Sequence, residues 1–384
     1  MIKCRQVFVR PALFRAGRIY TGYERIKRQK VMSWEEYTRQ VVPYVPGEQP
    51  KCKDIIKLNT NENPYPPAPG VERLLQDFDK ASLRLYPDPD SEELTRALAS
   101  YYGLSPAQVF VGVGSDDVLS MAFLTFFNSD KPILFPDITY SFYDVWADLY
   151  RIPYKVCPLD EQFGLRTADY KQENGGIIFP NPNAPTGIFE PVDSVEEILK
   201  ANPGVVVIVD EAYIDFGGTS CLPLLSKYEN LLVVQTFSKS RSMAGMRIGF
   251  AMGNEKLIGY LKNVKFSFNS YTMNRTSQVL GVEAVKDDAY FKACSTKIIE
   301  TRERIKKQLQ ELGFTFPDSK ANFIFAAHES IPGKTLFEEL KARKIFVRHW
   351  DKPRIANYLR ITVGTGEQMD ELLEALREIV AAHR

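Results

Sequence analysis

The chain has 384 residues, a formal net charge of +1 and a hydrophobic content of 44%. This length accommodates one large domain and a smaller one, and the near-neutral charge argues against a general polyanion-binding surface. Because the five cysteines are dispersed and the three histidines lie late in the chain, zinc sites, a disulfide framework and a histidine-centred nucleophile are disfavoured. No apolar run approaches the length of a membrane span.

The first residues differ in composition from the rest. Residues 1–31 are rich in Lys and Arg, and Glu24 is their single acid. Such a segment could be a nucleic-acid-binding arm or an Arg-rich targeting peptide. We predict instead a weakly packed basic extension. An N-terminal arm at residues 32–61 is expected to follow it and to associate with the small domain or with a partner subunit.

The next part of the chain alternates between strand-like and helical patterns. Strands are expected at Val109–Val113, Ile133–Phe135, Ile177–Phe179, Val205–Val209, Leu231–Val234 and Ile248–Met252, with a helix at Ser115–Phe127. Alternation of this kind is typical of a mostly parallel sheet with helices on both faces. We therefore predict an α/β large domain at residues 62–287.

A second, smaller α+β domain is expected at residues 288–384. Its first element is a long amphipathic helix, Asp288–Leu312, which ends at Gly313. The strands expected here are Phe323–Ala326, Phe346–Arg348 and Leu359–Val363, and the closing helix is Glu367–Ala381.

Lys239 is the most informative single residue. It follows a buried strand and the hydroxyl residues Thr236 and Ser238, and Arg247 comes eight positions later. Hydroxyls and an arginine can hold the phosphate of a phosphorylated aldehyde, while a lysine amine bonds to its carbonyl carbon. A polar loop with a solvated lysine would give the same pattern, so this segment alone leaves both interpretations open.

Asp210 strengthens the first interpretation. It ends the β-branched run Val205–Val209, and ligands of open α/β sheets lie beyond the carboxyl ends of the strands. A carboxylate at that point can pair with a protonated pyridine nitrogen, and Tyr213 could reach the hydroxyl of the same ring. The alternative is an acid that caps the next element.

A third polar group, Gly114-Ser115-Asp116, lies where a strand gives way to a helix. Free N–H groups and the helix dipole make such a point an anion site, here assigned to the phosphate of the same phosphorylated aldehyde. A plain helix cap would have the same sequence, and both interpretations can hold together.

Several motifs occur in an order that resembles one family. They are Asn61-Glu62-Asn63-Pro64-Tyr65-Pro66, Leu85-Tyr86-Pro87-Asp88, Gly112–Asp117, Asn181-Pro182-Asn183-Ala184-Pro185-Thr186-Gly187, the Lys239 segment and Leu359–Gly364. Together they resemble the histidinol-phosphate aminotransferases, which are fold-type I enzymes dependent on pyridoxal 5'-phosphate. The resemblance covers residues 32 to 384.

The resemblance implies further cofactor contacts. Tyr140 matches the aromatic residue that stacks on the pyridine ring, although its surroundings would equally suit a core aromatic. The family's usual asparagine before Pro-Thr-Gly is Ala184 here, and Asn183 precedes it. Either Asn183 turns in to contact the ring hydroxyl, or Tyr213 makes that contact alone.

The resemblance also implies substrate contacts. Arg360 and Arg348 match arginines that grip the acidic groups of the substrates, although each could instead be a surface cation at a strand edge. Tyr44 matches a contact to the substrate phosphate, and Asn61 belongs to the substrate side of the site. Tyr86 matches a tyrosine that reaches the cofactor of a neighbouring subunit, which implies a homodimer with shared active sites.

The function implied is transfer of the amino group of L-histidinol phosphate to 2-oxoglutarate in the cytoplasm, giving imidazole acetol phosphate and glutamate. The alternatives are a threonine-phosphate decarboxylase and an aromatic amino-acid aminotransferase. A non-catalytic DNA-binding regulator is disfavoured, because residues 1–31 are too short for a winged-helix module. No metal, nucleic acid or membrane is expected to take part.

Overall fold

The computed structural model describes residues 34–51 and 54–383, so the basic extension predicted at residues 1–31 lies outside the described residues. The chain divides into two compact units, Met1–Gln40 and Val41–Arg384. The described part of the first unit contains the 3-10 helix Trp34–Tyr37. The remaining description concerns the second unit.

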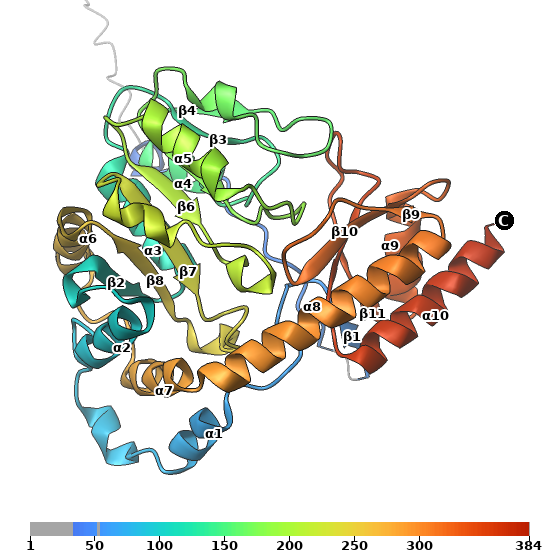
Figure 1. Cartoon of the computed structure of the whole chain (residues 1–384), viewed down its shortest axis with the longest axis horizontal. Coiled ribbons are helices and arrows are strands. Elements are labelled where there is room, and N and C mark those ends of the chain that lie inside the picture. Colours follow the sequence, from blue (N-terminus) through green and yellow to red (C-terminus); the bar gives the residue numbers. More distant parts are fainter. Residues whose placement is uncertain (1–33, 52–53, 384) are drawn as a thin grey trace, which may run out of the picture. The chain divides into compact units, whose positions relative to one another are not determined.

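The main feature of the second unit is a seven-stranded sheet with the strand order β2-β8-β7-β6-β5-β3-β4 (Figure 1). Its strands are β2 (Val109–Gly112), β3 (Ile133–Pro136), β4 (Tyr154–Cys157), β5 (Ile177–Pro180), β6 (Val207–Asp210), β7 (Leu231–Thr236) and β8 (Gly249–Gly253). Strands β3 to β7 pair in parallel, whereas β8 is antiparallel to both of its neighbours. The predicted mostly parallel sheet is therefore confirmed.

Helices cover both faces of this sheet, because successive strand residues point to opposite sides and both sides are apolar. On β7, Val233 belongs to one core and Val234 to the other. The first core is closed by α1 (Pro69–Gln76), α2 (Glu92–Tyr102), α5 (Val192–Ala201) and α7 (Arg275–Lys286). The second is closed by α3 (Ser115–Phe126), α4 (Tyr143–Tyr150) and α6 (Glu255–Phe268).

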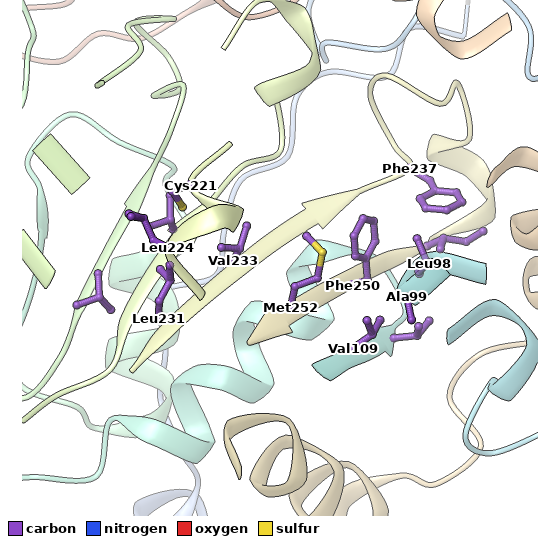
Figure 2. Packing of buried hydrophobic residues seen from close by; sticks show 14 of the residues in the cluster. Leu98, Ala99, Val109, Cys221, Leu224, Leu231, Val233, Phe237, Phe250 and Met252 are labelled. Carbon is purple, nitrogen blue, oxygen red and sulfur yellow. The ribbon is translucent and has the colours of Figure 1, made fainter. Parts of the chain in front are cut away.

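The first core shows how closely the strands and helices pack. Val233 of β7 lies opposite Met252 of β8 in the sheet, and Leu98 of α2 covers this side next to Phe250 (Figure 2). All four side chains are almost fully buried. A rigid sheet is therefore fixed under the loops that leave its carboxyl end.

A third core surrounds a four-stranded antiparallel sheet of order β12-β13-β10-β9, together with the parallel pair β1-β11. The strands are β1 (Ile56–Lys57), β9 (Phe314–Thr315), β10 (Phe323–His328), β11 (Ile345–Phe346), β12 (Arg348–His349) and β13 (Leu359–Thr362). The helices are α8 (Asp288–Glu311), α9 (Gly333–Ala342) and α10 (Gly366–Ala382). Because β1 pairs with β11 and Leu58 is part of the same core, residues 56–58 belong with these elements rather than with the seven-stranded sheet.

Two features differ from the sequence predictions. The expected single strand Phe346–Arg348 is wrong: Phe346 pairs with Lys57 in β1, whereas Arg348 pairs with Arg360 in β13. The chain changes partner at Val347, so one predicted strand serves two sheets. Strand β4 was not predicted either, since three of its four residues are exposed at the sheet edge and form no apolar run.

No helix in the described residues is both long and apolar enough to pass through a bilayer. Within the same residues, no group of His, Cys, Asp and Glu side chains could hold a metal ion.

Candidate active site

Two adjoining cavities lie beyond the carboxyl ends of β6 and β7. The larger has a volume of about 460 Å³ and the smaller of about 100 Å³. They share the lining residues Asp116, Tyr140, Ala184, Tyr213 and Lys239. This is where an open α/β sheet binds its ligands, and it is where the sequence predicted the cofactor.

Lys239 stands at the junction of the two cavities. Its Nζ donates a hydrogen bond to the carbonyl of Thr60 at 3.1 Å and lies 5.7 Å from the centre of the Tyr213 ring. The Tyr213 hydroxyl accepts a hydrogen bond from Asn61 Nδ2 at 2.9 Å. Asn61 is itself fixed by two hydrogen bonds with Thr362, so three distant segments hold this corner together.

Asp210 is buried at the floor of the smaller cavity. Its carboxylate accepts hydrogen bonds from the Tyr143 hydroxyl at 3.0 Å and from the Ala212 N–H at 3.2 Å. Burial raises the pKa of Asp210 to about 7, against the lowering effect of these two hydrogen bonds. Since no described cation pairs with it, the site presents a buried carboxylate that a cationic ligand atom would stabilise.

The opposite end of the smaller cavity is a set of hydrogen-bond donors. It is lined by Ser115 at the start of α3, by Thr236 at the end of β7, by Ser238 just after β7, and by Arg247. Arg247 contacts Ser238 Oγ at 3.4 Å and the carboxylate of Asp116 at 3.3 Å. Hydroxyls, a guanidinium and a helix N-terminus together suit a phosphate group.

Glycines keep this end of the cavity open. Gly114 caps α3 with a φ of 87°, and a Cβ there would lie 2.4 Å from Arg247 Nη2. A Cβ on Gly249 would lie 2.2 Å from the backbone of Gly114 and Ser115. The approach of β8 to the start of α3 therefore requires glycine at both positions.

Tyr140 and Asn183, the two residues predicted to contact the ring, differ in whether they line the cavities. Tyr140 lines both cavities, and its hydroxyl donates to Asp116 Oδ1 at 2.7 Å. Asn183 lines neither, because its amide nitrogen donates to the carbonyl of Ile138 and to Thr186. Ala184 lines the cavities in place of Asn183. Of the two alternatives for the contact to the ring hydroxyl, this arrangement favours Tyr213.

These residues fit pyridoxal phosphate. The donors around Arg247 match its phosphate, and Lys239 lies between them and the larger cavity. Asp210 offers its carboxylate to a protonated ring nitrogen, and Tyr140 offers an aromatic face. Two observations support this fit: the hydrogen-bond donors around Arg247 suit a phosphate group, and Asp210 is a buried acid with which no described cation pairs.

The larger cavity carries the predicted substrate residues. Tyr44 stacks on Phe142 with ring centres 4.0 Å apart, and Arg348 and Arg360 line the wall above it. Arg360 Nη2 donates to the carbonyl of Asn59 at 3.0 Å, and its buried Nε has no partner. Burial lowers the pKa of Arg360. A partly buried guanidinium with a free donor is prepared for an anionic ligand.

Tyr86 lies outside both cavities. Its side chain is 79% exposed, and its ring contacts Tyr271 with centres 4.8 Å apart. Within one chain it therefore has no role in the site.

Sequence reasoning missed several residues that support or line the site. Tyr143 lines neither cavity, and its contact with Asp210 was not predicted; only its position three residues after Tyr140 hinted at it. The segment Trp350–Ile355 was passed over, yet most of it lines the larger cavity. Arg354 in this segment donates to Asp137 and to the carbonyls of Leu159 and Asp160, and so ties it to the large sheet.

A Gly249→Ala substitution should weaken binding of pyridoxal phosphate by at least about tenfold and destabilise the protein by about 1–3 kcal/mol, since the new methyl group overlaps backbone atoms. Titration of the apoprotein with cofactor, followed by absorbance, measures the first effect, and thermal unfolding measures the second. Gly245→Ala is the matched control: Gly245 lies in the 3-10 helix Ala244–Met246 just before β8, with nothing within 4 Å of its Cβ, and both quantities should stay unchanged. Equal behaviour of the two variants would contradict the close approach.

Comparison with known proteins assigns the family. The family model for aminotransferase class I and II matches residues 53–376. A histidinol-phosphate aminotransferase of Lactococcus lactis subsp. cremoris (strain MG1363) is 52% identical over 347 residues, which cover 90% of this chain and 98% of the relative. One of Clostridium botulinum (strain Kyoto / Type A2) is 50% identical with the same coverage.

The fold has relatives among solved structures. The crystal structure of histidinol-phosphate aminotransferase from Sinorhizobium meliloti in complex with pyridoxal-5'-phosphate superposes with a TM-score of 0.78 at 23% identity, over 86% of this chain and 92% of that chain. The predicted fold type is thereby confirmed. The chain is an aminotransferase that uses pyridoxal phosphate, and it belongs to the class I and II aminotransferase family, in the histidinol-phosphate aminotransferase group.

Proposed function

We propose that the enzyme transfers the amino group of L-histidinol phosphate to 2-oxoglutarate, giving imidazole acetol phosphate and glutamate, a step of histidine biosynthesis. The observation that carries the proposal is the pair Arg348 and Arg360, which line the larger cavity together with Lys239. Two guanidiniums suit a phosphate monoester and a dicarboxylate, the two anions that this reaction binds in turn. The names of the relatives point to the same substrate.

We assign the chemistry to three residues. Bound pyridoxal phosphate supplies an electron sink for the charge that develops at the substrate Cα. Lys239 would hold the cofactor through a covalent bond to its amine, and its amine is the group placed to move the proton at the substrate Cα. Asp210 keeps the ring nitrogen protonated, and Tyr213, held by Asn61, donates to the ring hydroxyl.

The remaining cofactor contacts orient the ring. Ser115, Thr236, Ser238 and Arg247 bind the phosphate at the start of α3, where Gly114 leaves room. Tyr140 covers one ring face and excludes water, while Asp116 holds both Tyr140 and Arg247 in place. Tyr44 is assigned to the substrate phosphate, on the wall facing the two arginines.

We also propose a homodimer with shared active sites. Tyr86 is exposed and packs on Tyr271, and Leu83, Leu85 and Phe268 in the same two segments are exposed as well. Apolar side chains that gather on a surface are typical of a subunit interface. Light scattering should give twice the chain mass of 43.8 kDa, and a monomer at working concentration would refute the proposal.

Two further expectations remain proposals. A cytoplasmic location is supported by Cys157, Cys221 and Cys294, which are free thiols in the described residues. A boundary between domains at residues 287 and 288 is supported by the separate cores on either side of it.

The decisive experiment compares substrates. The holoenzyme is incubated with L-histidinol phosphate or threonine phosphate, each with 2-oxoglutarate, and glutamate and carbon dioxide are both measured. We expect glutamate with histidinol phosphate and no carbon dioxide with either compound. Carbon dioxide released from threonine phosphate would favour the decarboxylase. Faster glutamate formation from phenylalanine or tyrosine would favour an aromatic amino-acid aminotransferase.

A further inference from the structure

Arg348 and Arg360 lie side by side although their like charges repel each other. They are direct partners across the antiparallel pair β12-β13, and both line the larger cavity. Like charges placed opposite each other on neighbouring strands repel. The nearby Arg354 pairs with Asp137, but neither of these two arginines forms an ion pair with a described carboxylate. Some other group must therefore offset the repulsion.

Trp350 supplies such a group for both arginines, whereas Phe323 lies only against Arg360, with its ring centre 5.4 Å from Cζ. The centre of its ring lies 5.3 Å from Arg348 Cζ and 5.2 Å from Arg360 Cζ. The position follows from the strand, since Trp350 is two residues after Arg348 on the same side and diagonal to Arg360. The electron-rich face of an indole attracts guanidinium groups, more strongly than the rings of Tyr or Phe.

An aromatic face differs from a carboxylate in one respect that matters here. A carboxylate would offset the charge by accepting hydrogen bonds from the guanidinium N–H groups, and those donors would then be lost to a ligand. A ring face offsets the charge through its quadrupole and leaves the N–H groups in the guanidinium plane free. The orphaned Nε of Arg360 agrees with donors that no protein group occupies.

We propose that Trp350 is a positioning residue for substrate recognition: its ring holds Arg348 and Arg360 side by side and leaves donors that no protein group occupies, Arg360 Nε among them, for the phosphate of the amino donor and the carboxylate of the acceptor. The inference rests on the proposed function and deepens it. Because both substrates use the same two arginines in turn, removal of the ring should affect the binding of both.

The test compares Trp350→Leu and Trp350→Phe with the wild-type holoenzyme. Trp350→Leu should raise KM for L-histidinol phosphate and for 2-oxoglutarate by about tenfold each, with kcat changed by less than about threefold. Trp350→Phe keeps a ring with a weaker π face and should raise both KM values by about threefold. The partial rescue by Phe separates the ring face from mere bulk.

A second readout does not depend on turnover. Inorganic phosphate, titrated into the holoenzyme, whose cofactor occupies the other phosphate site, should change the fluorescence of Trp350 when it binds the two arginines. The chain has three tryptophans. The fluorescence change should therefore persist in Trp34→Phe, whose side chain is 75% exposed, and disappear in Trp350→Phe.

The outcomes separate the two proposals. Unchanged KM values in Trp350→Leu, or equal losses in the Leu and Phe variants, would overturn the role of the ring. A wild-type enzyme without activity on histidinol phosphate would refute the proposed function, while the phosphate titration would still test Trp350. Should Trp350→Leu fail to fold, Trp350→Phe decides alone: a rise of both KM values supports the proposal, and unchanged KM values with a retained fluorescence response overturn it.

Discussion

A Lys239→Ala enzyme should transfer amino groups at least about 10⁴-fold more slowly than wild type. Lys239 is the one lysine that lines the smaller cavity, so no other described amine there can bond to the cofactor or move the proton at Cα. The measurement is single-turnover conversion of bound cofactor by histidinol phosphate.

Lys239→Arg is the matched control, because it keeps the positive charge but cannot form the covalent bond. It should be as inactive as the alanine variant, and near-normal turnover would show that Lys239 contributes only charge. Borohydride reduction of the wild-type holoenzyme, followed by peptide mapping, should place the modified residue at position 239. A label on any other lysine would contradict the assignment.

An Asp210→Asn enzyme should lose about 10³-fold or more in kcat, since a neutral amide cannot keep the ring nitrogen protonated. Glu211→Gln is the control: Glu211 is also buried, but it accepts hydrogen bonds from Ser220 and Gln235 and lines neither cavity. Its kcat should stay within a few-fold of wild type. Steady-state rates at saturating substrate measure both variants, and comparable losses would show that Asp210 acts only through packing.

Although Asp210→Asn should lower kcat, it should make the apoprotein more stable at pH 8. Burial raises the pKa of Asp210 from 3.8 to about 7, so the folded state binds a proton that the unfolded state has already released. Folding stability attributable to Asp210 is therefore lost as the pH rises from about 4 to about 7, by on the order of 4 kcal/mol, and the loss is complete above that range.

Denaturant unfolding of apoprotein at several pH values tests this sign. Asp210→Asn should be close to wild type near pH 4 and more stable at pH 8, because the amide carries no charge to desolvate. The difference between the two proteins isolates the residue, since all other titrating groups are shared. A difference that does not vary with pH would mean that Asp210 titrates normally in the folded state.

The elements that could be predicted from the sequence are those that a short run of neighbouring residues identifies. The segments that form β6 and β7 contain β-branched residues and are buried on both faces, so a short stretch of sequence is enough to recognise them as strands. Strand β4 has no such run, because a sheet edge needs little apolar surface. The change of sheet at Val347 depends on which strands lie beside residues 346 and 348, and no local pattern encodes it.

The residues of the site differ in the same way: some belong to local motifs, and others act across long distances in the sequence. Lys239, Asp210 and Arg247, which line one cavity, could be proposed from the sequence because each lies at or after a recognisable strand in a motif of known chemistry. The side chains that support them could not, since they act across long sequence distances. Tyr143 contacts Asp210 from the start of α4, and Trp350 contacts Arg360 across two strands. For Asn183 the motif left two alternatives open, and its amide donates to the carbonyl of Ile138 rather than lining either cavity.

The anchoring of Asn61 has a consequence for how the enzyme is made. Asn61 donates to Tyr213 in the middle of the chain and exchanges hydrogen bonds with Thr362 near its end. A nascent chain on the ribosome therefore cannot complete the corner beside Lys239 until β13 has emerged. Vitamin B6 capture should in consequence follow translation, and the colour of the bound cofactor marks molecules whose synthesis is finished.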